Sequence, residues 1–189
     1  MRAKADSVEQ GLPHDARSQI APGTRCDSRH ARPLNAMPIR FATIADVPAL
    51  VEVGLRMHAL TRFKAFEYNG QKVARAFTDL IGKAKGKYVF LVADNAAGTL
   101  NGALIGVLEQ HIFSDQVTAS VVHYDVLPEA RMGGYGVRLL NAFEQWCANR
   151  KVVEINFGVN SGDAFEVVGQ FAVRMGYRKV GENFVKDME

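Results

Sequence analysis

Residues 126–140 read Val126-Leu127-Pro128-Glu129-Ala130-Arg131-Met132-Gly133-Gly134-Tyr135-Gly136-Val137-Arg138-Leu139-Leu140. This stretch predicts the end of a β-strand, a glycine-rich turn and the start of an amphipathic helix. Glycine lets the backbone approach a ligand because it carries no Cβ. The first N–H groups of a helix lack partners within it, and the helix dipole adds positive potential there. The stretch therefore predicts a phosphate-binding loop, with Arg131 and Arg138 placed to add charge-assisted contacts.

Two other phosphate-binding patterns do not match this stretch. The loop lacks the Gly-Lys-Ser/Thr ending of the nucleotide-hydrolase P-loop. Its glycine spacing is not that of the dinucleotide fingerprint, and no early βαβ unit surrounds it. A plain glycine turn with no ligand is the remaining structural alternative. The frame Pro-Glu-x-Arg-x-x-Gly-x-Gly argues against that alternative.

Around the loop, periodicity and turn residues predict six strands and four helices. The expected strands are residues 39–42, 88–93, 100–113, 117–127, 152–159 and 177–186. The expected helices cover residues 43–60, 70–82, the segment from the glycine loop to about 150, and 163–175. The first helix starts at a capping-box-like pair, Thr43 and Asp46. Antiparallel strands followed by a βαβαβ section predict an α/β or α+β fold with helices on both faces of one sheet.

Composition excludes several function classes. The chain has 189 residues, 48% of them hydrophobic, which suits one ordinary core, and no apolar run approaches the roughly 18 residues of a membrane-spanning helix. Cys26 and Cys147 are too few and too far apart for a disulfide framework or a zinc site. The formal net charge is +3, of which residues 1–36 contribute +2. The remaining residues are nearly balanced, so neither a nucleic-acid nor a membrane partner is expected.

Residues 1–36 differ from the rest of the chain. They are rich in Arg, Ser, Pro, Asp and Ala and show no sustained helix or strand period. They also lack the apolar core of a secretory signal. We expect a disordered extension, or a segment upstream of a translation start at Met37, and a single folded domain over residues 37–189.

From Pro38 to about Lys186 the chain resembles the GNAT superfamily of N-acyltransferases. The resemblance is carried by Arg131-Met132-Gly133-Gly134-Tyr135-Gly136 and by the lead-in from Val126 to Glu129. It implies a mixed, mostly antiparallel central sheet with acetyl-CoA as co-substrate and no metal. The pyrophosphate would lie on the backbone amides after Arg131, and the thioester between strands 117–127 and 152–159. The implied CoA-binding residues are Tyr124, Val126, Arg131, Met132, Gly133, Gly134, Tyr135, Gly136 and Val137.

The resemblance implies acetyl transfer to a primary amine of a small molecule, peptide or protein. It is nearest to small GNAT proteins of bacteria and their phages. A cytoplasmic location is expected, or association with the virion for a phage protein. A homodimer or a larger assembly is also consistent with this family. The aromatic and basic stretch 62–68 lies where such proteins shape their acceptor site.

The sequence departs from the family at the expected proton donor. A Tyr is usual a few residues before a Gly-Phe pair, but Gly176-Tyr177 is preceded by Ala172 at that position. Alanine cannot donate a proton, so other groups must act. The candidate catalytic residues are Glu109, His111, His123 and Tyr124. The alternative function is a catalytically weak or inactive binding or structural protein on the same fold, for example a component of a phage particle.

Deleting residues 1–36 is expected to leave both the melting temperature and CoA binding unchanged. The segment lacks the periodic apolar residues that would dock it on a core. Thermal unfolding of the full-length and truncated proteins, with and without CoA, checks this. A clearly lower melting temperature after truncation would show that the segment packs against the domain or a partner.

Overall fold

The computed structural model describes residues 38–83, 86–162 and 165–188. The expectation about residues 1–36 lies outside them. Within these ranges the chain forms one five-stranded sheet whose strands lie in the order β1-β2-β3-β4-β5. The strands are β1 (Ile39–Phe41), β2 (Tyr88–Asp94), β3 (Leu100–Gln110), β4 (Val117–Val126) and β5 (Glu154–Phe157). Neighbouring strands are antiparallel except β4 and β5, which are parallel. The mixed, mostly antiparallel sheet is confirmed.

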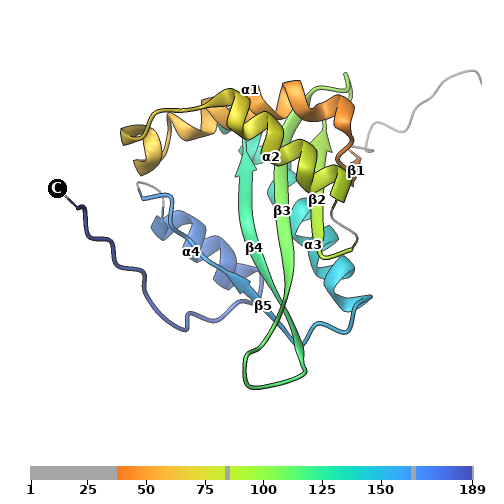
Figure 1. Ribbon diagram of the computed structural model, residues 1–189, viewed down its shortest axis with the longest axis vertical. Coiled ribbons are helices and arrows are strands. Elements are labelled where there is room, and N and C mark those ends of the chain that lie inside the picture. Colours follow the sequence, from red (N-terminus) through yellow and green to blue (C-terminus); the bar gives the residue numbers. More distant parts are fainter. Residues whose placement is uncertain (1–37, 84–85, 163–164, 189) are drawn as a thin grey trace, which may run out of the picture. The chain divides into compact units, whose positions relative to one another are not determined.

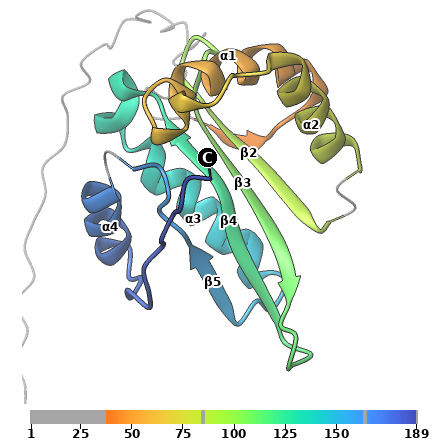
Figure 2. The ribbon, with the colours of Figure 1, turned by 60° about the vertical axis from the view of Figure 1, so that its left-hand side comes forward.

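Helices cover both faces of the sheet (Figures 1 and 2). They are α1 (Val47–His58), α2 (Gly70–Lys83), α3 (Tyr135–Ala148) and α4 (Phe165–Arg174). On one face α2 packs on β2 through an edge-to-face contact between Phe77 and Phe90, with ring centroids 5.1 Å apart. On the other face Phe143 of α3 lies directly over Gly106 of β3.

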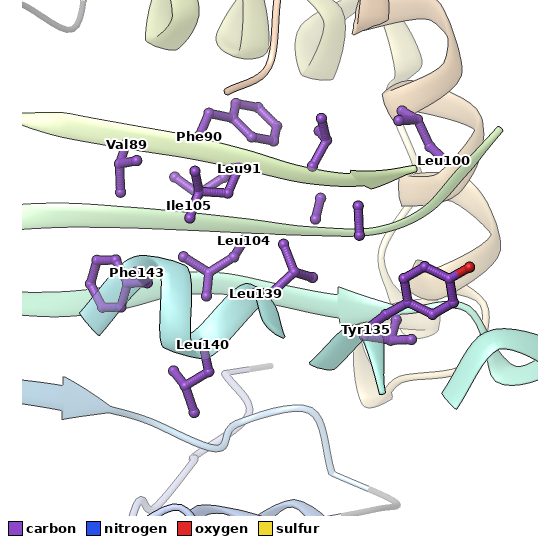
Figure 3. Packing of buried hydrophobic residues seen from close by; sticks show 14 of the residues in the cluster. Val89, Phe90, Leu91, Leu100, Leu104, Ile105, Tyr135, Leu139, Leu140 and Phe143 are labelled. Carbon is purple, nitrogen blue, oxygen red and sulfur yellow. The ribbon is translucent and has the colours of Figure 1, made fainter. Parts of the chain in front are cut away.

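One part of the core lies between α3 and the sheet (Figure 3), and buried residues of α1 on the other face belong to the same cluster. Leu104 of β3 and Leu139, Leu140 and Phe143 of α3 have no exposed surface. These α3 residues recur at helical spacing, so one stripe of the helix faces the sheet. Burying a large aliphatic or aromatic side chain contributes about 1.5–3 kcal/mol. Together these residues hold one face of α3 against the sheet.

Two strands are at least three residues shorter than the sequence prediction, whereas β1, β2 and β4 end within one residue of it. β3 ends at Gln110, where it pairs with Val117, and residues 111–116 form the hairpin loop. The amide of Ser114 donates to the carbonyl of His111, which turns the chain away from the strand direction. β5 is likewise shorter than the predicted 152–159, because the ladder with β4 covers only Glu154–Phe157; just before it, the amide of Val153 donates to the carbonyl of Val117 at 3.0 Å.

The predicted strand 177–186 is wrong. Residues 177–188 have no assigned secondary structure and are drawn as plain coil in Figures 1 and 2. No backbone hydrogen bond joins residues 178–188 to another described residue. A strand is defined by its partner, and β5 does not pair with this segment.

Arg40 ties the first strand to the start of α1. Its guanidinium donates to Asp46 at 2.7 and 2.8 Å and to Asp94 at 2.7 and 3.2 Å. The amide and hydroxyl of Thr43 also donate to Asp46, so the predicted pairing of these two residues at the helix start is confirmed. Hydrogen bonding to Arg40 holds the pKa of Asp46 well below its ordinary value.

Replacing Arg40 with Ala is expected to lower the free energy of unfolding by about 1–3 kcal/mol, because the buried Asp94 carboxylate would lose its partner. A carboxyl whose pKa is depressed on folding stabilises the protein above its unfolded pKa and loses that effect as the pH falls. The difference between variant and wild type should therefore shrink below about pH 4. Urea unfolding at pH 7 and pH 3 measures both effects.

Lys179→Ala is the control for this prediction. Lys179 pairs with Glu182 at 2.7 Å, but both side chains are well exposed. Such a surface pair contributes little, so the variant should stay within about 0.5 kcal/mol of wild type. If Arg40→Ala cost no more than Lys179→Ala, the Arg40 network would have no structural role.

Candidate functional site

The glycine loop connects β4 to α3 through two tight turns. Pro128–Gly133 forms a 3-10 turn, and Gly134 follows with φ 71°, a left-handed conformation that favours glycine. No atom lies within 4 Å of the position that a Cβ on Gly134 would occupy. The loop therefore has an open side at Gly134, immediately before the first residue of α3.

The first turn of α3 has unpaired backbone donors. Its first intrahelical bond runs from Arg138 N–H to the carbonyl of Gly134, at 3.2 Å. The amides of Tyr135, Gly136 and Val137 consequently have no acceptor within the helix, and no side chain caps it. Three free amides at the positive end of a 14-residue helix are an arrangement suited to binding an anion.

Arginines hold the carbonyls of the loop. Arg138 donates to the carbonyls of Gly133 at 2.8 Å and Gly134 at 3.3 Å, and its guanidinium lies 5.1 Å from the ring centroid of Tyr135. Arg131 Nε donates to the carbonyl of Val126 at 3.4 Å. The two guanidinium groups lie beside the glycine loop, and their charge adds positive potential there.

The carboxylate nearest the loop is paired. Glu129 accepts a 2.6 Å hydrogen bond from Arg56 of α1, and this contact lowers its pKa. Pairing reduces the repulsion that Glu129 would exert on a bound anion. Met132 is almost fully exposed, so its side chain contacts the remainder of the loop very little.

β5 pairs along its whole length with the first half of β4. Their register runs from Thr118↔Glu154 to Val121↔Phe157, and no residue of β5 pairs with β4 beyond that point. Figure 2 shows β4 continuing past the end of β5. Residues 123–126 thus pair with β3 on one side only. On the β5 side, the backbone of this part of β4 has no partner among the described residues, and it leads directly into the glycine loop.

An aromatic cluster lies between these strands and α4. The ring of Tyr124 is 5.3 Å from that of Phe157 and 6.1 Å from that of Phe171, and Phe157 in turn contacts Tyr177 at 5.8 Å. Burial raises the pKa of Tyr124, so its phenol stays protonated at neutral pH. A Cβ on Gly136 would come within 2.3 Å of the Tyr124 hydroxyl oxygen, so glycine is required for this close approach.

Ala172 is buried in this region, at the position where a Tyr was expected. Its neighbour Phe171 stacks on Tyr124, and its carbonyl accepts from the amide of Tyr177 at 3.0 Å. Tyr177 donates its hydroxyl to Glu144 at 3.0 Å, and burial followed by this contact raises its pKa. Sequence reasoning missed Tyr177 as a phenol close to the aromatic cluster. The signal was a Tyr in place of Phe after Gly176.

His123 faces the opposite side of the sheet from Tyr124. It pairs with Ile105, while Val122 is left unpaired by a bulge in β4. His123 Nε2 contacts Asp125 Oδ2, two residues along the same strand. Burial lowers the pKa of His123, but hydrogen bonding and charge from Asp125 outweigh it, so the net shift is upward. Sequence reasoning missed Asp125, although alternate residues of a strand share a face.

Glu109 and His111 lie away from this region. Glu109 pairs with Thr118 near the hairpin and contacts the Ser120 hydroxyl. Five residues of strand, on the order of 17 Å, separate Thr118 from His123. His111 follows the end of β3, on the exposed rim of a hollow of about 440 Å³ formed by residues 110–115. The structure therefore places the Tyr124 phenol against Gly136 of the glycine loop, and His123 next to it along β4 but on the opposite face; Glu109 and His111 lie toward the hairpin.

The aromatic and basic stretch 62–68 is anchored at both ends. Arg62 donates its backbone amide to Ser161 at 2.9 Å and its Nε to the carbonyl of Asn160 at 2.8 Å. Tyr68 donates its hydroxyl to the carbonyl of Val51 in α1, at 2.8 Å. The stretch consequently connects α1 with the loop that follows β5.

In residues 38–83, 86–162 and 165–188, no cluster of three or more His, Cys, Asp or Glu side chains could hold a metal ion. No helix in the same ranges has the length and apolar character needed to cross a bilayer.

The sequence also matches a known protein family. A family model described as the acetyltransferase (GNAT) family matches residues 56–165, which include the glycine loop. No curated protein matches the sequence.

Several solved structures share the fold at low identity. A tetramutant of a Bacillus halodurans protein is 20% identical with a TM-score of 0.68, over 80% of this chain and 100% of that one. Glucosamine-6-phosphate N-acetyltransferase from Arabidopsis thaliana is 13% identical with a TM-score of 0.63, over 80% and 98%. An aminoglycoside acetyltransferase from an uncultured soil metagenomic sample is 14% identical with a TM-score of 0.62, over 80% and 96%.

Proposed function

Because this chain belongs to the acetyltransferase (GNAT) family, we propose that it transfers an acetyl group from acetyl-CoA to a primary amine. The acceptor would be a small molecule, a peptide or a protein. The observation that carries the proposal is the row of three free amides at the start of α3, at the end of the unpaired edge of β4. The free amides of α3 follow directly after the unpaired backbone edge of β4. This order would suit a ligand whose pyrophosphate is followed by an amide-containing arm.

The residues for CoA divide into three roles. The amides of Tyr135, Gly136 and Val137 would hold the pyrophosphate, and the open side of Gly134 would let it approach. Arg131 and the neighbouring Arg138 would supply positive potential. Residues Tyr124 to Val126 would pair through their unpaired backbone edge with the amides of the pantetheine arm. Met132 would contact the ligand, if at all, through its backbone.

For the transfer step we assign His123 as the general base. The amine nitrogen attacks the thioester carbonyl, the C–N bond forms, and the C–S bond breaks. His123 takes the proton from the amine on the α1/α2 face of the sheet, directly or through water, and Asp125 holds its imidazole in place. The thiolate is protonated on the opposite face, where the phenol of Tyr124, whose ring stacks on Phe171 next to Ala172, is the candidate acid. The base and the acid lie on opposite faces of the sheet. This arrangement suits a reaction in which the amine enters from one side and the thiolate leaves on the other.

A second candidate function is CoA binding without turnover. The observation that favours it is Ala172, which removes the hydroxyl that the family resemblance assigns to that helix position. Glu109 and His111 do not compensate, because they lie at the hairpin end of β4.

Release of free thiol from acetyl-CoA separates the two functions. The assay covers a panel of primary amines, amino acids and peptides, with a parallel measurement of CoA binding. Turnover above the buffer rate with at least one amine supports the transferase. CoA binding without turnover for any acceptor class supports the binding protein instead.

A further inference from the structure

We propose that the acceptor of this protein carries an anionic group, a carboxylate or a phosphate, in addition to its amine, and that Arg62 binds this group. The inference rests on the proposed acetyl transfer and names the chemical class of the acceptor. It starts from a guanidinium group that is held in place by the fold and has two donor nitrogens without a partner.

Several contacts hold the side chain of Arg62 in one position. Its backbone amide donates to the carbonyl of Ser161 at 2.9 Å, and its Nε donates to the carbonyl of Asn160 at 2.8 Å. The guanidinium carbon lies 4.4 Å from the ring centroid of Phe63. A Cβ on Gly162 would come within 3.0 Å of the Arg62 Cβ, so the two backbones approach closely. Because the side chain is already ordered, a ligand would lose little of the rotamer entropy that binding to a free arginine costs.

The terminal nitrogens of Arg62 are not used by the described part of the chain. Neither Nη1 nor Nη2 has an acceptor there, and no described carboxylate forms an ion pair with the group. The exposed Lys64 also has no ion-pair partner in these ranges, and residues 61–66 carry two positive charges and no negative one. A guanidinium presents two parallel N–H donors that match a carboxylate or a phosphate. The free part of Arg62 therefore favours an anionic ligand group over a neutral one.

Arg62 and the assigned base His123 lie at the same end of the sheet. The β4–β5 ladder ends at Val121↔Phe157, and both strands run on in the same direction from that point. His123 follows Val121 by two residues and Asn160 follows Phe157 by three, so the two positions are on the order of 10 Å apart. In Figures 1 and 2 the segment between α1 and α2 lies at the end of the sheet toward which β4 and β5 run. One acceptor molecule can therefore reach both residues.

The charges at the two positions have opposite signs. His123 contacts the largely buried carboxylate of Asp125, which attracts the ammonium form of an approaching amine. Arg62 and Lys64 supply the positive charge at the other position. This pattern orients a molecule that carries both an amine and an anion, because only one of its two ends is attracted to each position. An acceptor with several amines and no anion would instead bring positive charge against Arg62.

Thiol release with two matched pairs of amines tests the inference: 4-aminobutanoate against 4-aminobutanamide, and 3-aminopropyl phosphate against 3-aminopropanol. We expect the charged member of at least one pair to have a kcat/KM at least about tenfold higher, and the preferred pair distinguishes carboxylate from phosphate. In Arg62→Gln this ratio should fall close to one, mainly through the KM of the charged amine. Arg62→Lys keeps the charge without the paired donors and should give an intermediate ratio. The matched control is Arg75→Gln, an exposed arginine on α2, which should keep the wild-type ratio.

Calorimetric titration of the same four amines into protein saturated with CoA gives a readout that does not need turnover. The charged amine of the preferred pair should bind wild type at least about tenfold more tightly than its neutral counterpart, and Arg62→Gln should remove the difference. This binding pattern without any acetyl transfer would contradict the proposed function but support the role of Arg62. Charged and neutral amines that bind equally, or a difference that Arg62→Gln leaves intact, would overturn the inference even if neutral amines are acetylated. Thermal unfolding verifies that each variant is folded.

Discussion

Replacing Gly134 with Asp is expected to weaken CoA binding at least about tenfold. The new carboxylate would occupy the open side of the loop, in front of the free amides of α3. Two like charges about 8 Å apart repel by roughly 2 kcal/mol at an effective dielectric constant of 20, which exceeds the 1.4 kcal/mol of a tenfold change. Isothermal titration calorimetry of both proteins with CoA measures the ratio.

Two controls separate charge from backbone strain. Gly134→Asn places a side chain of the same shape at the same positive φ without a charge, so it should lose less affinity. Gly98→Asp adds the same residue at a similar φ of 79°, in the turn between β2 and β3. It should cost comparable stability and leave CoA affinity unchanged. Equal affinity of wild type and Gly134→Asp would mean that the loop is only a turn.

Replacing His123 with Ala is expected to lower kcat/KM for acetyl transfer by about 10²–10⁴-fold, the usual loss for a general base. The base acts in its neutral form, so the wild-type rate should rise with pH through a pKa above 6.5. Asp125→Asn removes the contacts that raise this pKa while burial still lowers it. The rise should therefore move to lower pH, which a purely structural role of Asp125 would not produce.

Matched variants on the same sheet check this assignment. His111→Ala and Glu109→Gln alter residues at the hairpin end of β4, and both should keep wild-type kcat/KM. The rates come from thiol release over pH 5.5–9, with binding of CoA measured for every variant. Wild-type activity in His123→Ala, or a large loss in His111→Ala, would reject His123 as the base.

Local patterns predicted the parts of the fold that local interactions determine. The strand predicted to end at Leu127 ends one residue earlier, at Val126. The glycine turn and the α3 stripe of Leu139, Leu140 and Phe143 are confirmed, because each rests on short-range geometry or helical period. The pairing of Thr43 with Asp46 is confirmed for the same reason.

Long-range pairing could not be predicted in this way. Residues 177–186 have strand-like composition, but whether they form a strand depends on a partner that is distant in sequence. The β4 bulge at Val122 and the early end of β3 at Gln110 are set by register between strands. For this reason the sequence grouped Glu109 and His111 with His123, whereas register places the first two at the other end of β4.

Calorimetric titration of the wild-type protein with acetyl-CoA tests the central claim most directly. Binding of one acetyl-CoA per chain, with comparable affinity for CoA, is the result expected from the free amides of α3 and the unpaired edge of β4. Well-folded protein that gives no binding heat at several temperatures, and no rise in melting temperature at millimolar acetyl-CoA, would contradict it.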